Sequence, residues 1–303
     1  MKAAIHVSHV EFESSGVLLQ GSLFLPQGEG PWPAILLCHG FGSDRRVMRV
    51  TALDAARWGM AVLTFDFRGH GQSGGVYVGD PVDDVLAAID HLAHLPRIDP
   101  QRIALVGHSM GARTVLQAAA RDPRAKAVVS LACAPDLEGK TKEWMEHFAE
   151  ELAKEGHALC HYPQFDRLPV ANALQNRWMI TSMQRNGFRL TIDWPRAVAA
   201  WGATGAKRAV REMSPRPLLF VHCRWDKLAP YQVSVELYEL ASPPKELFLE
   251  RWGFHSSPYR WPQLRRRWLD WLLSVLGADG AARRVHGGHL LVWRASRVAP
   301  RRG

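Results

Sequence analysis

The sequence has 303 residues and a mass of 34.0 kDa, which suits one large α/β domain or such a core with an inserted subdomain. It lacks an uninterrupted apolar stretch of membrane-span length, and residues 1–12 lack the apolar core of a signal peptide, so we expect a soluble, cytoplasmic protein. The four cysteines are few for this length and fit a reducing compartment.

The formal net charge of +9 lies largely at one end of the chain. No acidic residue follows Asp279 in the sequence, whereas six arginines do. A terminal charge run is usually a solvated, poorly ordered end, so we expect residues 279–303 to form a basic tail. We therefore expect no nucleic-acid partner. Salt-sensitive binding of the tail to nucleic acid or anionic lipid is the alternative.

The first elements alternate between strands and helices. Two stretches of alternating polarity, 6–13 and 17–25, predict an antiparallel hairpin. The apolar run 34–38 predicts a strand buried on both faces, and it ends in His39-Gly40-Phe41-Gly42. The next predicted elements are a helix over 47–58 and a strand over 61–65.

Asp80-Pro81 begins the next predicted helix, with Asp80 as its N-cap and Pro81 at the first helical position. A strand over 103–106, a helix over 112–120 and a strand over 126–131 follow. This alternation indicates a mostly parallel sheet with helices on both faces. Ligands of such sheets collect at the carboxyl ends of the strands.

The alternation stops between residues 136 and 211, where helical patches at 142–154 and 171–183 occur among many aromatic residues. We predict a helical cap inserted after the sixth strand. Most of its aromatic side chains should pack the cap onto the core, and a few that face inward would form an apolar substrate pocket. The pattern then resumes with strands at 217–222 and 245–250 and helices at 233–240 and 261–276. The predicted organisation is an α/β core over 1–135 and 212–278, a cap over 136–211 and a tail over 279–303.

A serine occupies the turn between a predicted strand and a predicted helix in Gly107-His108-Ser109-Met110-Gly111. A nucleophile at such a corner is held in strained backbone geometry, and glycines two residues to either side let the flanking elements approach closely. The N–H of Met110 would lie at a helix N-terminus, where it can stabilise an oxyanion. A glycine-rich turn without catalytic function is the alternative, which the flanking strand and helix disfavour.

A serine hydroxyl needs a base within hydrogen-bond reach, and the base needs an anion that fixes its tautomer. Asp226 and His255 each follow a predicted strand, so both should lie on loops at the same sheet edge as Ser109. Asp136 follows another strand and is the alternative acid, although position and local pattern favour Asp226. The sequence therefore predicts a triad of Ser109, Asp226 and His255.

Five features occur together and in order: His39-Gly40-Phe41-Gly42, Asp66-Phe67-Arg68-Gly69-His70-Gly71-Gln72-Ser73, Gly107-His108-Ser109-Met110-Gly111, Asp226 and His255. With them the chain resembles the α/β-hydrolase superfamily over residues 17–276, and within it bacterial carboxylesterases of the cinnamoyl or feruloyl esterase type. The resemblance implies that Ser109 is the nucleophile, His255 the general base and then acid, and Asp226 its orienting anion. It also implies an oxyanion hole formed by the backbone N–H groups of Phe41 and Met110.

The chain departs from this pattern at His222-Cys223, where relatives often carry His-Gly. The cap cannot be aligned with that of the relatives, so the resemblance implies no substrate-binding residue there.

Other residues with ligand chemistry are expected to be structural. Four histidines beside the site should shape its loops by hydrogen bonding: His39, His70, His108 and His222. Three residues with metal-ligand chemistry, His157, Cys160 and His161, lack a partner set, so we expect no metal site. The Arg265-Arg266-Arg267 run lies on the last predicted helix, where we expect a solvated face.

We therefore expect a cofactor-independent serine hydrolase that cleaves carboxylic esters through an acyl-enzyme on Ser109. Its substrates would be small to medium molecules with an apolar or aromatic group. A thioesterase, an acyltransferase or a peptidase would use the same triad. A ligand-binding protein of this fold with little turnover is a further alternative. The sequence is compatible with a monomer or a homodimer.

Overall fold

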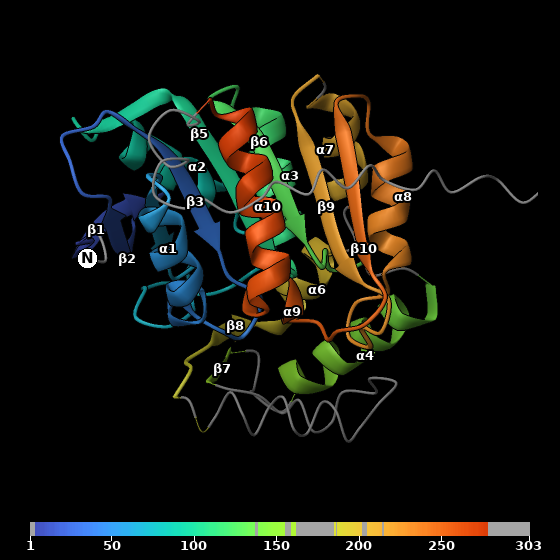
Figure 1. The fold of residues 1–303 in the computed structure, drawn as a ribbon. Coiled ribbons are helices and arrows are strands. Elements are labelled where there is room, and N and C mark those ends of the chain that lie inside the picture. The colour runs from blue at the N-terminus through green and yellow to red at the C-terminus, as the bar shows by residue number, and fades with distance from the viewer. Residues whose placement is uncertain are drawn as a thin grey trace, which may run out of the picture.

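The structure is a computed structural model that describes residues 4–136, 139–154, 159–161, 185, 187–201, 205–213 and 215–277. The predicted tail, the predicted helix at 171–183 and parts of the predicted cap lie outside these residues. An eight-stranded sheet forms the centre, with the strand order β1-β2-β4-β3-β5-β6-β9-β10 (Figure 1). None of the described helices is both long enough and apolar enough to cross a membrane.

The sheet is mostly parallel, as predicted. β1 (His6–Ser14) and β2 (Val17–Leu25) form the predicted antiparallel hairpin at one edge, and β2 pairs antiparallel with β4 (Ala61–Phe65). The other strands run parallel to β4: β3 (Trp32–Cys38), β5 (Ile98–His108), β6 (Ala125–Leu131), β9 (Leu218–Cys223) and β10 (Lys245–Glu250). Their carboxyl ends therefore meet at one edge of the sheet.

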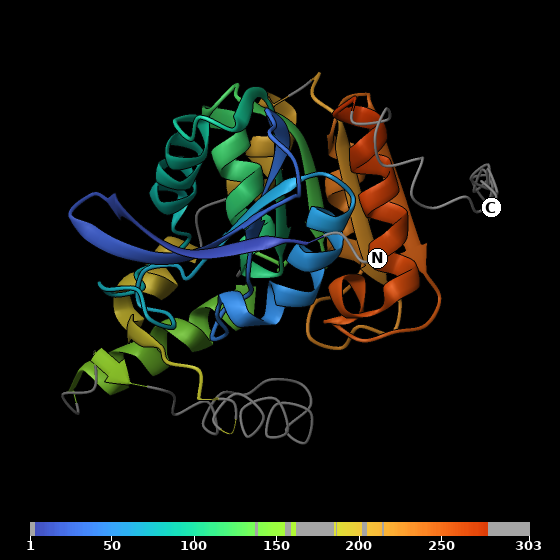
Figure 2. The ribbon, with the colours of Figure 1, turned by 60° about the vertical axis from the view of Figure 1, so that its left-hand side comes forward.

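Helices cover both faces of the sheet, and Figure 2 shows the teal and red helices on opposite sides of it. One face carries α2 (Val82–Ala93), α3 (Met110–Arg121) and α8 (Gln232–Leu240), and the other carries η1 (Arg45–Met48), α1 (Arg49–Arg57), α9 (Ser257–Arg260) and α10 (Pro262–Val275). Successive side chains of β3 alternate between the two cores: Leu36 and Cys38 face one, whereas Ile35 and Leu37 face the other. This double burial explains why β3 reads as a continuous apolar run.

The segment between β6 and β9 contains α4 (Gly139–Lys154), β7 (Leu159–His161), β8 (Thr191–Asp193), α6 (Trp194–Trp201) and α7 (Gly205–Glu212). In both views α4 and the β7–β8 pair lie beyond the carboxyl ends of the central strands (Figures 1 and 2). The antiparallel β7–β8 pair was not predicted, because the sequence analysis placed only helices there. The division into core and cap stays a prediction.

The predicted N-cap of α2 is wrong. The helix begins at Val82 with Pro81 as its N-cap, and no side chain caps it. The Asp80 carboxylate instead accepts hydrogen bonds from Arg113 and Gln117, both at 2.8 Å. The Asp80 carboxylate therefore binds the charged guanidinium of Arg113 on a neighbouring helix rather than the backbone N–H groups at the start of α2.

The expectation of a solvated arginine run on α10 is also partly wrong. The Arg265 side chain is 7% exposed and pairs with Asp54 at 2.6 Å, while its Nη1 donates to the carbonyl of Tyr259 at 2.9 Å. Arg266 and Arg267 are exposed, as expected. Arg265 therefore attaches α10 to α1 rather than facing water.

Candidate active site

Ser109 lies at the turn between β5 and α3 with φ 57° and ψ −116°, a strained conformation for a residue with a side chain. A β-carbon on Gly107 would collide with the backbone of Gly111, and one on Gly111 would lie 2.5 Å from the carbonyl oxygen of His39. Only glycine fits at these two positions, so the predicted sharp turn is confirmed. Met110 is the first residue of α3, where backbone N–H groups lack an intrahelical acceptor.

The structure brings Asp226 and His255 together. Nδ1 of His255 donates to Oδ2 of Asp226 at 2.7 Å, and Oδ1 of Asp226 accepts from the backbone N–H groups of Leu228 and Ala229 at 2.9 and 3.0 Å. Burial by itself raises the pKa of the Asp226 carboxyl, but hydrogen bonds from His222 and His255 outweigh it and hold the pKa well below the usual range. Asp226 is therefore a buried carboxylate that fixes the tautomer of His255.

Asp136, the alternative acid, has a different partner. Its Oδ1 lies 2.6 Å from Nη1 of Arg113, and both side chains are almost completely buried. The second edge of the same guanidinium binds Asp80. The carboxylate at the end of β6 is thus held by an arginine rather than by the predicted catalytic histidine.

His222 contacts the acid directly, which the sequence analysis missed. Its Nε2 lies 3.2 Å from Oδ2 of Asp226 and 3.0 Å from the carbonyl oxygen of Ala229, while Nδ1 lies 2.7 Å from Oγ of Ser234. Because both neighbours of Nε2 are acceptors, we assign the proton to Nε2 and let Ser234 donate to Nδ1. The sequence did contain a signal for this contact, because His222 lies near the end of the predicted strand that leads to Asp226.

His108 connects the Ser109 turn to the His255 loop. Its Nε2 donates to the carbonyl oxygen of His255 at 2.9 Å, and the two ring centroids lie 4.5 Å apart. Burial and then the nearby His255 lower the pKa of His108 to about 3, so its ring is neutral. Among the described residues, no hydrogen bond joins the Ser109 hydroxyl to His255, and the two loops meet through His108.

The loop after β3 lies against the serine. A β-carbon on Gly40 would lie 3.2 Å from Cβ of Ser109. The carbonyl oxygen of Gly40 accepts from His39 Nδ1 and Ser43 Oγ, both at 2.8 Å, so it points back into its own loop. Because a trans peptide is planar, the N–H of Phe41 points in the opposite direction.

The Phe41 side chain joins this loop to the inserted segment. Its ring centroid lies 5.2 Å from that of Tyr77, 6.5 Å from Trp194 and 5.6 Å from Trp201. Nε1 of Trp201 donates to the Tyr77 hydroxyl at 2.8 Å. Aromatic residues of α6 therefore pack on the loop that carries the predicted oxyanion donor.

The expected loop-shaping role of the histidines is confirmed for His39 and His70 as well. Nε2 of His39 accepts from the backbone N–H of Phe67 at 3.1 Å, and Nδ1 of His70 donates to the carbonyl of Arg68 at 3.0 Å. Burial followed by the charge of His39 lowers the pKa of His70 to about 3. Both rings therefore act as fixed hydrogen-bonding groups.

The sequence matches a known protein family over most of its length. The profile of the family described as "Serine aminopeptidase, S33" matches residues 30–257. The chain belongs to this family of α/β-hydrolases. The predicted fold class is thereby confirmed.

Relatives of this S33-family protein differ in how much of their length they share with it. The quorum-quenching protein AidA of Acinetobacter baumannii is 39% identical over 129 residues, which are 40% of this chain and 42% of AidA, so the chain matches less than half of that relative. The thiohydrolase aneE of Aspergillus aculeatus is 26% identical over 272 residues, 79% of this chain and 83% of aneE. The structure of Est1E from Butyrivibrio proteoclasticus with ferulic acid bound shares the fold, with a TM-score of 0.66 at 18% identity over 88% of this chain and 99% of Est1E.

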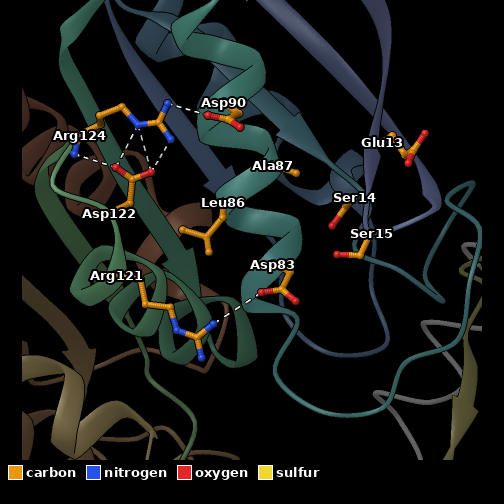
Figure 3. A pocket seen from close by; sticks show the side chains of 10 residues that line it. All are labelled: Glu13, Ser14, Ser15, Asp83, Leu86, Ala87, Asp90, Arg121, Asp122 and Arg124. Carbon is orange, nitrogen blue, oxygen red and sulfur yellow. Dashed lines mark hydrogen bonds and ion pairs between the residues drawn. The ribbon is translucent and has the colours of Figure 1, made fainter.

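A hollow of about 450 Å³ on the S33-family protein lies away from the predicted catalytic residues, between α2, the end of α3 and the β1–β2 turn (Figure 3). Its arginines are paired with acidic neighbours: Arg121 with Asp83 at 3.5 Å, and Arg124 with Asp90 at 2.7 Å and Asp122 at 2.6 Å. Because both arginines are already paired with carboxylates, we assign no ligand to this hollow.

The described residues contain no group of three or more His, Cys, Asp or Glu side chains arranged to hold a metal ion. Of the three residues with ligand chemistry singled out in the sequence, His157 lies outside the described residues, and the side chains of Cys160 and His161 are not described.

Proposed function

We propose that the protein hydrolyses carboxylic esters through an acyl-enzyme on Ser109. The observation that carries this proposal is the 2.7 Å hydrogen bond between His255 and the buried carboxylate of Asp226, on loops that meet the strained Ser109 turn. A base whose tautomer is fixed by an anion, next to a serine at a sharp turn, is the arrangement that nucleophilic acyl transfer requires.

In the proposed mechanism, Oγ of Ser109 attacks the acyl carbon and Nε2 of His255 takes its proton. Binding of substrate brings the hydroxyl and the imidazole into hydrogen-bond contact. Asp226 stabilises the imidazolium, and the N–H groups of Phe41 and Met110 stabilise the oxyanion. The C–O bond to the alcohol then breaks as His255 protonates the leaving oxygen. Water, activated by the same histidine, hydrolyses the acyl-enzyme.

The aromatic residues beside the oxyanion loop support apolar or aromatic acyl groups as substrates. Tyr77, Trp194 and Trp201 gather around Phe41, so a group next to the reacting carbonyl would meet aromatic surface. The ferulic acid bound to Est1E is a group of this kind.

The test is hydrolysis of p-nitrophenyl esters from acetate to laurate, and of methyl ferulate, by the wild type and Ser109→Ala. We expect turnover by the wild type and a fall in kcat of about 10⁶ for Ser109→Ala. Ser274→Ala, a serine variant on the exposed side of α10, is the matched control and should keep full activity. Absence of turnover by the wild type on every ester would refute the proposal.

Thioester hydrolysis is the second candidate, because aneE, a relative matched over 83% of its own length, is named a thiohydrolase. The same triad serves both reactions, but a thiolate leaves without needing full protonation. Comparing kcat/KM for an ester and a thioester with the same acyl group would distinguish the two candidate activities. A higher kcat/KM for the thioester would favour this candidate, and a matched p-nitroanilide would report peptidase activity.

A further inference from the structure

Three exposed aromatic side chains lie on the two loops that carry Asp226 and His255. Trp225, Trp252 and Phe254 are 51%, 50% and 63% exposed. Among the side chains whose exposure the structure describes, these are the large aromatic ones that face solvent. The ring centroids of Trp225 and Trp252 lie 5.0 Å apart. A cluster of exposed apolar side chains of this size usually marks an interaction surface.

Basic side chains lie among these aromatic rings. Nζ of Lys227 lies 5.9 Å from the ring centroid of Trp225, and the guanidinium carbon of Arg251 lies 5.0 Å from that of Trp252. Within the described ranges, neither these two cations nor Arg224 forms an ion pair with an acidic side chain. We name six residues together the aromatic–basic patch: Arg224, Trp225, Lys227, Arg251, Trp252 and Phe254.

Acidic groups contribute little on the two loops that form the aromatic–basic patch. The loops 224–231 and 251–256 contain one acidic residue, Asp226, and its carboxylate is buried and bonded to two histidines. Glu250 precedes the second loop, and its Oε1 accepts from the backbone N–H of Arg251 at 3.0 Å. With three cations and one partly exposed carboxylate, the surface is complementary to an anionic partner.

The loops are held firmly, so the exposure of the rings is a property of the fold. The backbone N–H of Phe254 donates to Oγ of Ser257 at 2.8 Å, and that of Arg224 donates to the carbonyl of Glu250 at 2.9 Å. At Gly253, which has φ 120°, a β-carbon would lie 2.7 Å from Sγ of Cys223, so the two loops pack closely. This backbone directs the aromatic rings outward.

We propose that the aromatic–basic patch docks the protein on an anionic lipid surface. Tryptophan and phenylalanine side chains partition into the headgroup region of a bilayer, and arginine and lysine pair with the phosphates there. At the core of protein interfaces arginine is enriched together with aromatic residues, but lysine is depleted. Here the ammonium group of Lys227 lies against the Trp225 ring, which matches a headgroup layer better than the core of a protein interface.

Docking by this face would place the loop that carries His255 against the bilayer. Amphiphilic esters collect there. That consequence rests on the proposed function, whereas docking itself does not. Because vesicle binding is measured without turnover, failure of one proposal can be told from failure of the other.

The test is co-sedimentation of the full chain with phosphatidylcholine vesicles that contain about one third phosphatidylglycerol, and with phosphatidylcholine vesicles alone. We expect binding to the anionic vesicles, and a fall of at least about tenfold when Trp225, Trp252 and Phe254 are all changed to alanine. Changing Arg224, Lys227 and Arg251 to glutamine should weaken binding about fivefold per residue. The matched control, Leu18→Ser with Val50→Ser, changes exposed apolar residues on other elements and should bind as the wild type does.

The basic tail is present in all these variants, so any binding it contributes cancels in the comparison. A thermal unfolding midpoint equal to that of the wild type would show that the patch variants are folded. Equal vesicle binding by the wild type and the aromatic variant would overturn the proposal, and so would absence of binding by the wild type. Self-association of the wild type that the aromatic variant loses, without vesicle binding, would overturn it in favour of a second copy of the chain.

Discussion

Asp226 and Asp136 occupy similar positions in the sheet but have different partners. Each is a buried carboxylate on the loop after a parallel strand, β9 for Asp226 and β6 for Asp136. Asp226 binds two histidines, whereas Asp136 binds the guanidinium of Arg113. An imidazole gains and loses a proton near neutral pH, but a guanidinium stays charged. The chemistry available to a strand-end carboxylate is therefore set by its partner rather than by its position.

Arg113 also shows what the second carboxylate does. Its guanidinium joins Asp136, at the start of the inserted segment, to Asp80, just before α2. Gln117 of α3 donates to the same oxygen of Asp80. This network attaches the start of the inserted segment to α2 and α3. We therefore expect it to contribute to the stability of the fold rather than to catalysis.

The largest expected effect is that of Asp226→Asn. The variant keeps the shape of the side chain but removes the charge that fixes the His255 tautomer, so kcat on the best ester should fall by about 10⁴. Asp136→Asn is the matched control, and its folded protein should lose less than about tenfold. If Asp136→Asn reduced kcat as much as Asp226→Asn, the assignment of the acid would be wrong.

Arg113→Met should have the largest effect on stability. It leaves the buried carboxylates of Asp80 and Asp136 without their cationic partner, so the free energy of unfolding should fall by about 3–5 kcal/mol, as measured by urea unfolding. The matched control is Arg121→Met on the same helix, because Arg121 is exposed and its contact with Asp83 is long. Similar losses for the two variants would mean that the Arg113 network has no special role.

His222 should influence activity through Asp226. His222→Leu removes one hydrogen bond from the carboxylate, so kcat should fall about tenfold while KM stays unchanged. Because the amide of glutamine can replace the Nε2 donor, His222→Gln should recover part of the loss. Equal activity of the leucine and glutamine variants would show that packing, and not the hydrogen bond, accounts for the effect.

The smallest expected effect is the pH dependence that Asp226 gives to stability. Burial raises its pKa, but the two histidine hydrogen bonds outweigh this and leave the folded pKa below the unfolded value of about 3.9. Asp226 therefore contributes its full stability above about pH 5 and loses it as the pH falls through the folded pKa. Below about pH 4, the unfolding free energy of Asp226→Asn should change less steeply than that of the wild type in urea titrations. Parallel slopes would contradict this.

The sequence was most informative where structure is decided locally. The Ser109 turn follows from five consecutive residues, and β10 has its predicted bounds, Lys245–Glu250. The loop positions of Asp226 and His255 followed from strand ends. Prediction failed where a charged group on another element, or across a turn, decides the outcome.

Three side chains illustrate these failures. Asp80 turns from the helix start to Arg113, Arg265 turns from solvent to Asp54, and His222 reaches Asp226 after the chain reverses. Each partner lies on another element or across a turn, so neither local propensity nor hydrophobic period carries the information.

The ring contacts of Phe41 have a consequence for protein engineering. One residue supplies the proposed oxyanion N–H through its backbone and touches Trp194 and Trp201 of α6 through its side chain. A library that enlarges the acyl site at either tryptophan therefore also alters the support of the catalytic backbone. Because Phe41 contributes to both, a change that widens the range of substrates should also lower the turnover rate. Variants that accept larger acyl groups should therefore need a compensating change at Phe41 or Tyr77 to recover kcat.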